Sequence, residues 1–157
     1  GLRRAEVCEL KVKQVSLKNK SAKIIGKGNK ERTIYFPQPV LNVLKSWLEL
    51  RQLNKDEIDA GFVFGRIDNK QCLHLDVPLD PSSVTRIIEK LVAETENLEG
   101  RLTPHDLRRT FATRLISKNV DIVEVQKLMG HASVATTGNY VRKDEENLRK
   151  AAEKAEL

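Results

Sequence analysis

The sequence has no long apolar run, little cysteine, and neither repeats nor low-complexity tracts. Its apolar runs are a handful of residues long, far short of the ~20 that a membrane-spanning helix needs, and no signal peptide is visible. The two cysteines, Cys8 and Cys72, make neither a disulfide framework nor a zinc site. These absences argue against a membrane protein and against a disulfide-rich scaffold. They favour a soluble domain in a reducing compartment, which we expect to be the cytoplasm.

What is present is enough for one packed domain. The 157 residues lie within the range of roughly 100–200 that is usual for a single domain. Hydrophobic residues make up 39% of the chain, too many for a disordered polyelectrolyte. The chain opens with Gly1, and its only methionine is Met129. We therefore interpret it as a piece of a longer protein whose N-terminal portion has been removed.

Basic residues are concentrated in two segments. Lys and Arg number 28 against 22 acids, a formal charge of +6. Residues 1–36 hold ten basic and three acidic residues, and residues 101–142 hold seven basic and three acidic residues. Between them, residues 37–100 hold seven basic and eleven acidic residues. If the fold brings the two basic segments together, they form a positive face suited to a polyanion. Chance clustering of surface charge is the alternative.

Hydrophobic periodicity predicts a mainly helical α+β fold with one small three-stranded antiparallel sheet. Apolar spacing indicates helices over about 3–10, 39–53, 81–96, from 104 onward, and 121–130, with a charged last helix over 143–157. Three short strands are expected between residues 12 and 36, and residues 54–80 are expected to be irregular. At the start of the helix from 104 onward, Thr103 suits the N-cap, Pro104 suits the first helical position and Asp106 suits the third. At the end of the helix over 121–130, Gly130 suits a left-handed C-cap.

Two neighbouring arginines in the helix that follows Thr103 have different predicted environments. Its apolar stripe is defined by Leu107, Phe111 and Leu115. At ~100° per residue, Arg108 lies within ~60° of the centre of this stripe and Arg109 lies ~160° away. We expect Arg108 to be partly buried, where a guanidinium needs an anion, and Arg109 to be solvated. His105 lies on the same side as Arg108. A structural salt bridge is the alternative for Arg108.

Further candidates lie in turns. Lys27 stands between two glycines at a predicted hairpin tip, where it either reaches a bound ligand or is simply solvated. His131 follows a predicted helix end and by itself would be a turn residue, and Tyr140 by itself would be a core or rim residue. Taken together, the arginines, the lysine, two histidines and a tyrosine, without paired carboxylates, suggest metal-free chemistry on a phosphate. Cations would neutralise the phosphoryl oxygens, and a tyrosine hydroxyl would be the nucleophile.

The motifs that hold these residues resemble those of the tyrosine recombinase (phage integrase) family. The match comprises five motifs in the family's order: Gly1-Leu-Arg3 with Glu6, Ile25-Gly-Lys27-Gly-Asn-Lys-Glu-Arg, Thr103-Pro-His-Asp-Leu-Arg108-Arg-Thr-Phe-Ala-Thr, Leu128-Met-Gly-His131, and Thr136-Thr-Gly-Asn-Tyr140. Together they cover nearly the whole chain. Arg109 is a departure, because the family commonly has a histidine at that position.

The resemblance implies a role for each matched phosphate ligand. Arg3 and Arg108 correspond to the arginines that clamp the scissile phosphate. His105 corresponds to the group that hydrogen-bonds the phosphate and manages the nucleophile's proton. His131 corresponds to a phosphate-contacting position that some relatives fill with Trp.

The resemblance also implies the reaction itself. Tyr140 corresponds to the nucleophile that forms a 3′-phosphotyrosyl link to DNA, and Lys27 to the general acid that protonates the leaving 5′-hydroxyl. Attack by the 5′-hydroxyl of a second strand then reverses the step. Because the bond energy is conserved, no ATP, metal or other cofactor is implied.

The resemblance further implies that residues 1–157 form the catalytic domain and that the family's N-terminal DNA-clamping domain is absent. Double-stranded DNA is the expected partner, and no membrane partner is expected. Residues 143–157 are expected to support self-association on DNA, with a solvated terminal helix as the alternative. Lys30, Arg32 and Arg86 are candidate DNA contacts, for which ordinary surface charge is the alternative.

Three activities are compatible with this interpretation. The first is a site-specific DNA recombinase or integrase. The second is a DNA-binding module of the same fold that no longer cuts, against which the intact set of six candidates argues. The third is relaxation of DNA supercoils as in type IB topoisomerases, which requires cleavage with little sequence preference and no synapsis.

Overall fold

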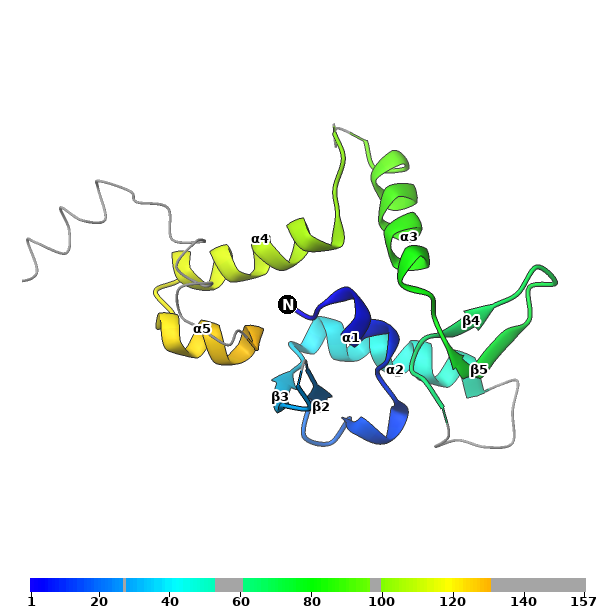
Figure 1. Cartoon of the computed structure of the whole chain (residues 1–157), viewed down its shortest axis with the longest axis horizontal. Helices are drawn as coiled ribbons and strands as arrows, with labels where there is room; N and C mark the ends of the chain where they lie inside the picture. The colour runs from blue at the N-terminus through cyan, green and yellow to red at the C-terminus, as the bar shows by residue number, and fades with distance from the viewer. Residues whose placement is uncertain (27, 53–60, 97–99, 131–157) are drawn as a thin grey trace, which may run out of the picture. The chain divides into compact units, whose positions relative to one another are not determined.

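The computed structural model describes residues 1–26, 28–52, 61–96 and 100–130 (Figure 1). Its elements are, in chain order, α1 (Arg4–Cys8), the 3₁₀ turn η1 (Val12–Gln14), β1 (Val15–Ser16), β2 (Ser21–Ile25), β3 (Glu31–Tyr35), α2 (Gln38–Gln52), β4 (Gly65–Ile67), β5 (Leu73–Pro78), α3 (Pro81–Ala93), α4 (Pro104–Ser117) and α5 (Ile122–Met129). The chain divides into two compact units, residues 1–108 and 109–157. The fold is mainly helical α+β, as predicted. Within the described ranges, no helix is long and apolar enough to cross a membrane.

A three-stranded antiparallel sheet with the order β1–β2–β3 confirms the strands predicted before residue 36. β2 and β3 form a hairpin in which Ile25 pairs with Glu31 next to the turn. Gly28 adopts a φ of 74° in that turn, a conformation that glycine reaches without strain. Because side chains alternate between the faces of a sheet, Ala22 and Ile24 both point into the core.

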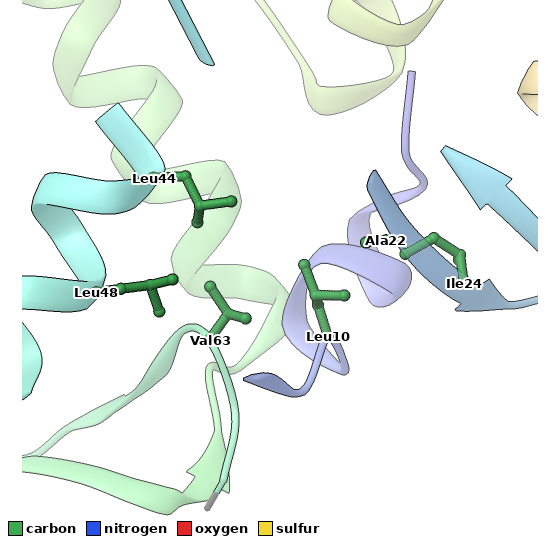
Figure 2. Packing of buried hydrophobic residues seen from close by; sticks show 6 residues of the cluster. All are labelled: Leu10, Ala22, Ile24, Leu44, Leu48 and Val63. Atoms are coloured by element: carbon green, nitrogen blue, oxygen red, sulfur yellow. The ribbon is translucent and has the colours of Figure 1, made fainter. Parts of the chain in front are cut away.

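The core of the first unit combines the sheet with α2 (Figure 2). Its buried side chains are Leu10, Ala22, Ile24, Leu44, Leu48 and Val63. Leu44 and Leu48 lie one turn apart on α2 and therefore share a face. The Trp47 indole N–H donates to the Val63 carbonyl oxygen at 2.8 Å. Each fully buried apolar side chain contributes roughly 1.5–3 kcal/mol, so this cluster fixes β2 and with it the base of the hairpin.

A second sheet, formed by β4 and β5, lies where the sequence predicted irregular chain. The prediction was wrong there for a physical reason. The antiparallel pairing shifts register between Gly65 and Arg66. A Cβ added to Gly65 would lie 2.3 Å from the His74 carbonyl oxygen, so the two backbones are in close contact. Strands interrupted by a bulge and a glycine do not show the period-two pattern that identifies a strand.

The ends of the last two described helices follow the predicted capping signals. The Thr103 backbone N–H donates to Asp106 Oδ2 at 2.9 Å, and the Asp106 N–H donates to Thr103 Oγ1 at 3.3 Å. This reciprocal cap fixes the start of α4. α5 ends at Gly130 with a left-handed φ of 62°. The buried cluster of the second unit comprises Ala112, Val125 and Met129. The helix predicted over 143–157 lies outside the described residues.

Candidate active site

Glu6 of α1 binds two arginines in the first unit. Its Oε1 accepts from Arg3 Nη1 at 2.8 Å and from Arg32 Nη1 at 2.9 Å. Its Oε2 accepts from the Arg3 backbone N–H and from Arg32 Nη2, both at 2.7 Å. Arg32 therefore uses both arms of its guanidinium on one carboxylate, which is a strong and directional arrangement. The contact with the Arg3 backbone also caps the first turn of α1.

The electrostatics of this cluster keep Glu6 ionised. Burial alone raises the pKa of the Glu6 carboxyl, but hydrogen bonds from Arg32 and then from Arg3 outweigh it and lower that pKa to about 2. The side chains of Glu6 and Arg32 are only 6% and 11% exposed, whereas that of Arg3 is 39% exposed. Arg3 is thus the member of the cluster that an external anion reaches most easily.

Arg108 has the environment that the helical period predicted. It is 6% exposed, and its Nη1 donates to the Gly1 carbonyl oxygen within the first unit, whereas Arg109 is exposed. The expected apolar stripe was wrong in one respect, because Leu107 is 47% exposed. The buried side of α4 instead runs from Arg108 to Ala112, one turn later.

The contact between Arg108 and Gly1 brings the two predicted phosphate-clamping arginines into one neighbourhood. Gly1 is two residues before Arg3, and two residues of chain span at most about 7 Å. The Arg108 guanidinium, 105 positions later in the sequence, therefore binds the backbone of the segment that leads into Arg3 and α1. Two guanidiniums with fixed surroundings are suited to holding a phosphate group.

The other predicted residues of the described ranges are exposed. His105 is exposed one turn before Arg108, and Lys30 is exposed beside the hairpin turn. Arg86 of α3 is also exposed, and its Nη2 donates to Ser83 Oγ at 3.1 Å. All three are accessible to DNA, and their functional roles stay predictions.

Three predicted catalytic residues, Lys27, His131 and Tyr140, lie outside the described residues. The residues that precede two of them are described. Gly26 is the residue before Lys27, and its N–H donates to the Lys30 carbonyl oxygen at 2.8 Å. The assignments of Lys27, His131 and Tyr140 stay predictions.

A groove of about 940 Å³ lies along the Glu6 cluster. It is lined by residues of α1, η1, β2 and the hairpin turn, including Arg3, Glu6, Lys11, Lys13, Lys23 and Gly26. The three lysines were not identified from the sequence, because single lysines on a basic surface carry no pattern. Among the described residues, no group of three or more His, Cys, Asp or Glu side chains is arranged to hold a metal ion.

The ion pair between Glu6 and Arg32 was also missed, although the sequence contains a signal for it. On β3, Arg32 and Ile34 are two residues apart and are the less exposed positions of an alternating strand. An arginine that shares the inward face with an isoleucine needs an anionic partner. Arg32 therefore belongs to the interior of this site, whereas the sequence suggested a surface DNA contact.

The first unit holds Arg3 at the N-cap of α1, Arg32 on β3 and Arg108 on α4, and guanidiniums of this kind are suited to binding a phosphate group. Comparison with known proteins identifies the family. The sequence profile of the phage integrase family matches residues 1–147. The chain is 36% identical over 158 residues to tyrosine recombinase XerA of Pyrococcus furiosus, covering 100% of this chain and 51% of that protein. It is 33% identical over 148 residues to tyrosine recombinase XerC of Alcanivorax borkumensis, covering 94% of this chain and 46% of that protein.

Solved structures agree with the sequence comparisons. A crystal structure of XerA recombinase matches with a TM-score of 0.76 and 33% identity, covering 99% of this chain and 53% of that one. A pre-cleavage complex of the XerH site-specific recombinase with its difH substrate matches with a TM-score of 0.70 and 28% identity, covering 96% of this chain and 42% of that one. The chain belongs to the phage integrase family, whose similar members are named tyrosine recombinases. It spans about half the length of the curated relatives it matches.

Proposed function

We propose that this chain is the catalytic domain of a site-specific recombinase that cleaves and rejoins DNA through a 3′-phosphotyrosyl intermediate at Tyr140. The observation that carries the proposal is the contact of Arg108 with the Gly1 carbonyl oxygen, two residues before Arg3 in the chain. Membership of the phage integrase family supports the same conclusion. XerH, a relative of similar fold, is a site-specific recombinase bound to its difH substrate.

The proposed reaction is a transesterification at phosphorus. The Tyr140 oxygen attacks the scissile phosphate, the bond from phosphorus to the 5′-oxygen breaks, and Lys27 gives a proton to that oxygen. His105 assists in taking the proton of the tyrosine hydroxyl. The 5′-hydroxyl of a second strand then attacks the phosphotyrosine, which releases Tyr140 and rejoins the DNA. One phosphoester bond is exchanged for another at each step, so no external energy source is needed.

The cations of the site lower the barrier to this exchange. Negative charge develops on the phosphoryl oxygens as the tyrosine attacks, and donors that are already in place stabilise it without reorganising. Arg3 is held by Glu6, and Arg108 is buried against Gly1, so both guanidiniums have fixed positions. A tyrosine hydroxyl has an ordinary pKa of about 10, and nearby cations favour its ionised form.

The proposed partners are double-stranded DNA and a second copy of the protein. Lys30 and Arg86 are exposed and basic, as DNA-contacting residues must be. Residues 143–157 are proposed to dock on a neighbouring protomer during strand exchange, with His131 contacting the scissile phosphate. We place this activity on DNA in the cytoplasm.

The test is covalent capture of DNA. The chain is incubated with a library of nicked suicide duplexes whose sequence around the nick is randomised, and SDS-resistant adducts are isolated and sequenced. We expect adducts from the unchanged chain, none from Tyr140→Phe, and unchanged adduct formation by the matched control Tyr35→Phe, which alters the only other tyrosine. DNA binding by Tyr140→Phe should persist.

The outcomes separate the three activities. A preferred sequence among the captured duplexes, together with junction products between two duplexes, supports a site-specific recombinase. Adducts without sequence preference, accompanied by relaxation of supercoiled plasmid, support a topoisomerase-like activity. DNA binding without any adduct supports a non-cutting module and contradicts the proposal.

A further inference from the structure

Arg32 is the more buried of the two arginines that bind Glu6, and its surroundings are unlike those of a DNA-reading residue. Its guanidinium is 11% exposed and gives Nη1 and Nη2 to the two oxygens of Glu6. The same two oxygens receive the side chain and the backbone N–H of Arg3. Arg3 and Arg32 therefore share one carboxylate, to which Arg32 donates with both arms of its guanidinium.

The charges of this triad explain why two arginines are needed. A single buried Glu6 would pair with Arg3 and cancel the positive charge that a phosphate requires. One carboxylate between two guanidiniums leaves the group with a net positive charge. Arg32 is the more enclosed of the two arginines, and Arg3, which is 39% exposed, is the one whose guanidinium an external phosphate reaches more easily.

The triad also lies against the hairpin that carries Lys27. Arg32 pairs with Ile24 across the β2–β3 ladder. A Cβ placed on Gly26 would lie 3.6 Å from Arg32 Nη1 and 3.8 Å from Glu6 Oε1, which is ordinary van der Waals contact, so the ion pair lies beside the base of the hairpin with room for one more atom between them. Gly26 is the residue immediately before Lys27. The ion pair thus links β3, which holds Arg32, to Glu6 of α1 and through Glu6 to Arg3, the N-cap residue of α1.

We propose that Arg32 is a positioning residue that acts through Glu6 to orient Arg3 and to join α1 to the base of the β2–β3 hairpin. This inference rests on the proposed function, in which Arg3 holds the scissile phosphate and Lys27 protonates the leaving group. It replaces a direct DNA contact by Arg32 with an indirect role. The feature that matters is the two-armed geometry of the guanidinium, which lysine does not reproduce.

The first test compares binding and cleavage. Arg32→Lys keeps the positive charge and loses the two-armed guanidinium. Arg66→Met is the control, because Arg66 is an exposed arginine on a different strand, β4, where it pairs with His74. With the duplex recovered by covalent capture, we expect Arg32→Lys to cleave about tenfold or more slowly at saturating DNA. Its Kd and its salt dependence should stay within about threefold of the unchanged chain. Weakened binding with a shallower salt slope would instead assign Arg32 to direct DNA contact and overturn the inference.

The second test asks whether the effect passes through Glu6. In a Glu6→Gln background, Arg32→Lys should change the cleavage rate less than about twofold, because residues that act through a shared partner are not additive. A full tenfold loss in that background would overturn the inference. Cleavage by the single variant Arg32→Lys at the rate of the unchanged chain would also overturn the inference, because the two-armed guanidinium would then be dispensable.

A third measurement does not depend on cleavage. The Nε–H resonance of Arg3, observed by NMR, should shift and exchange faster with water in Arg32→Lys and stay unchanged in Arg66→Met. An unchanged Arg3 resonance in Arg32→Lys overturns the inference even when the unchanged chain forms adducts. Failure of the unchanged chain to form any adduct contradicts the proposed function instead, so the two failures are distinguishable.

Discussion

At the residue scale, Arg108 and Arg109 are sequence neighbours with opposite surroundings. Arg108 is buried against Gly1, and Arg109 faces solvent. Losing one preorganised donor to a transition-state oxyanion costs about 10²–10³ in rate, so Arg108→Ala should slow cleavage by that factor. Arg109→Ala, an exposed change, should slow it less than about threefold. The measurement is the rate of adduct formation on the captured duplex, and equal losses would contradict the assignment.

The pH dependence of stability tests the Glu6 cluster. Folding lowers the pKa of Glu6 from 4.5 to about 2, so the folded chain binds this proton less tightly than the unfolded chain does. The stabilisation is therefore complete above about pH 4.5 and is lost as the pH falls towards 2. In urea unfolding, the unchanged chain should exceed Glu6→Gln in stability near neutral pH, and this difference should shrink between pH 4.5 and 2. A difference that is constant over that window would show that Glu6 is not held as described.

Single residues also show where prediction from sequence succeeds. The burial of Arg108 followed from helical geometry alone, because the period of α4 is fixed whatever packs against it. The partner of Arg32 did not follow, because Glu6 lies 26 positions earlier in the chain and only the folded sheet brings the two together. Helical geometry distinguished Arg108 from Arg109, whereas the inward position of Arg32 depends on a partner that is distant in the sequence.

At the element scale, the helices and the β1–β2–β3 sheet were predictable because each has a clean period and clear end signals. α2, for example, was expected over 39–53 and spans Gln38–Gln52. The β4–β5 pair was not predictable, since its strands are short and the ladder shifts register at Gly65. Its pairing depends on a close backbone approach that no side-chain pattern encodes.

The cap of α4 gives a test at this scale. Thr103→Ala removes the hydroxyl that accepts the Asp106 N–H, and loss of an N-cap typically costs about 1 kcal/mol. Thr113→Ala is the matched control, because Thr113 is exposed in the interior of the same helix, where alanine is the better helix former. We expect Thr103→Ala to lower the free energy of unfolding by about 1 kcal/mol and Thr113→Ala to leave it unchanged or slightly raised. Equal changes in the two variants would mean that the cap does not stabilise α4.

At the scale of the whole molecule, the uneven charge of the sequence takes on a structural meaning. The basic segments 1–36 and 101–142 supply Arg3, Arg32 and Arg108, which the first unit gathers around α1 and Gly1. A positive site assembled from distant parts of a chain attracts the DNA backbone before any base is read. The target sequence is a separate property, which covalent capture is designed to reveal.

If guanidiniums neutralise the phosphate as proposed, the reaction needs no divalent cation. We therefore expect the rate of adduct formation to change less than about twofold when EDTA is added, because Arg3 and Arg108 supply the charge that Mg²⁺ supplies in many phosphoryl-transfer enzymes. A metal-dependent nuclease in the same buffer serves as the control for chelation. Loss of adducts in EDTA, with recovery on addition of Mg²⁺, would contradict this expectation.

The most direct measurement of the central claim is the identity of the residue that carries the DNA. Trypsin cleaves after Lys127 and Arg142, which places Tyr140 in the peptide of residues 128–142. It also cleaves after Arg32 and Lys45, which places Tyr35 in the separate peptide of residues 33–45. Mass spectrometry of the nuclease-trimmed adduct should find a nucleotide mass on residues 128–142, attached through a 3′-phosphate at Tyr140. A nucleotide mass on residues 33–45, on a serine, or through a 5′-phosphate would contradict the account.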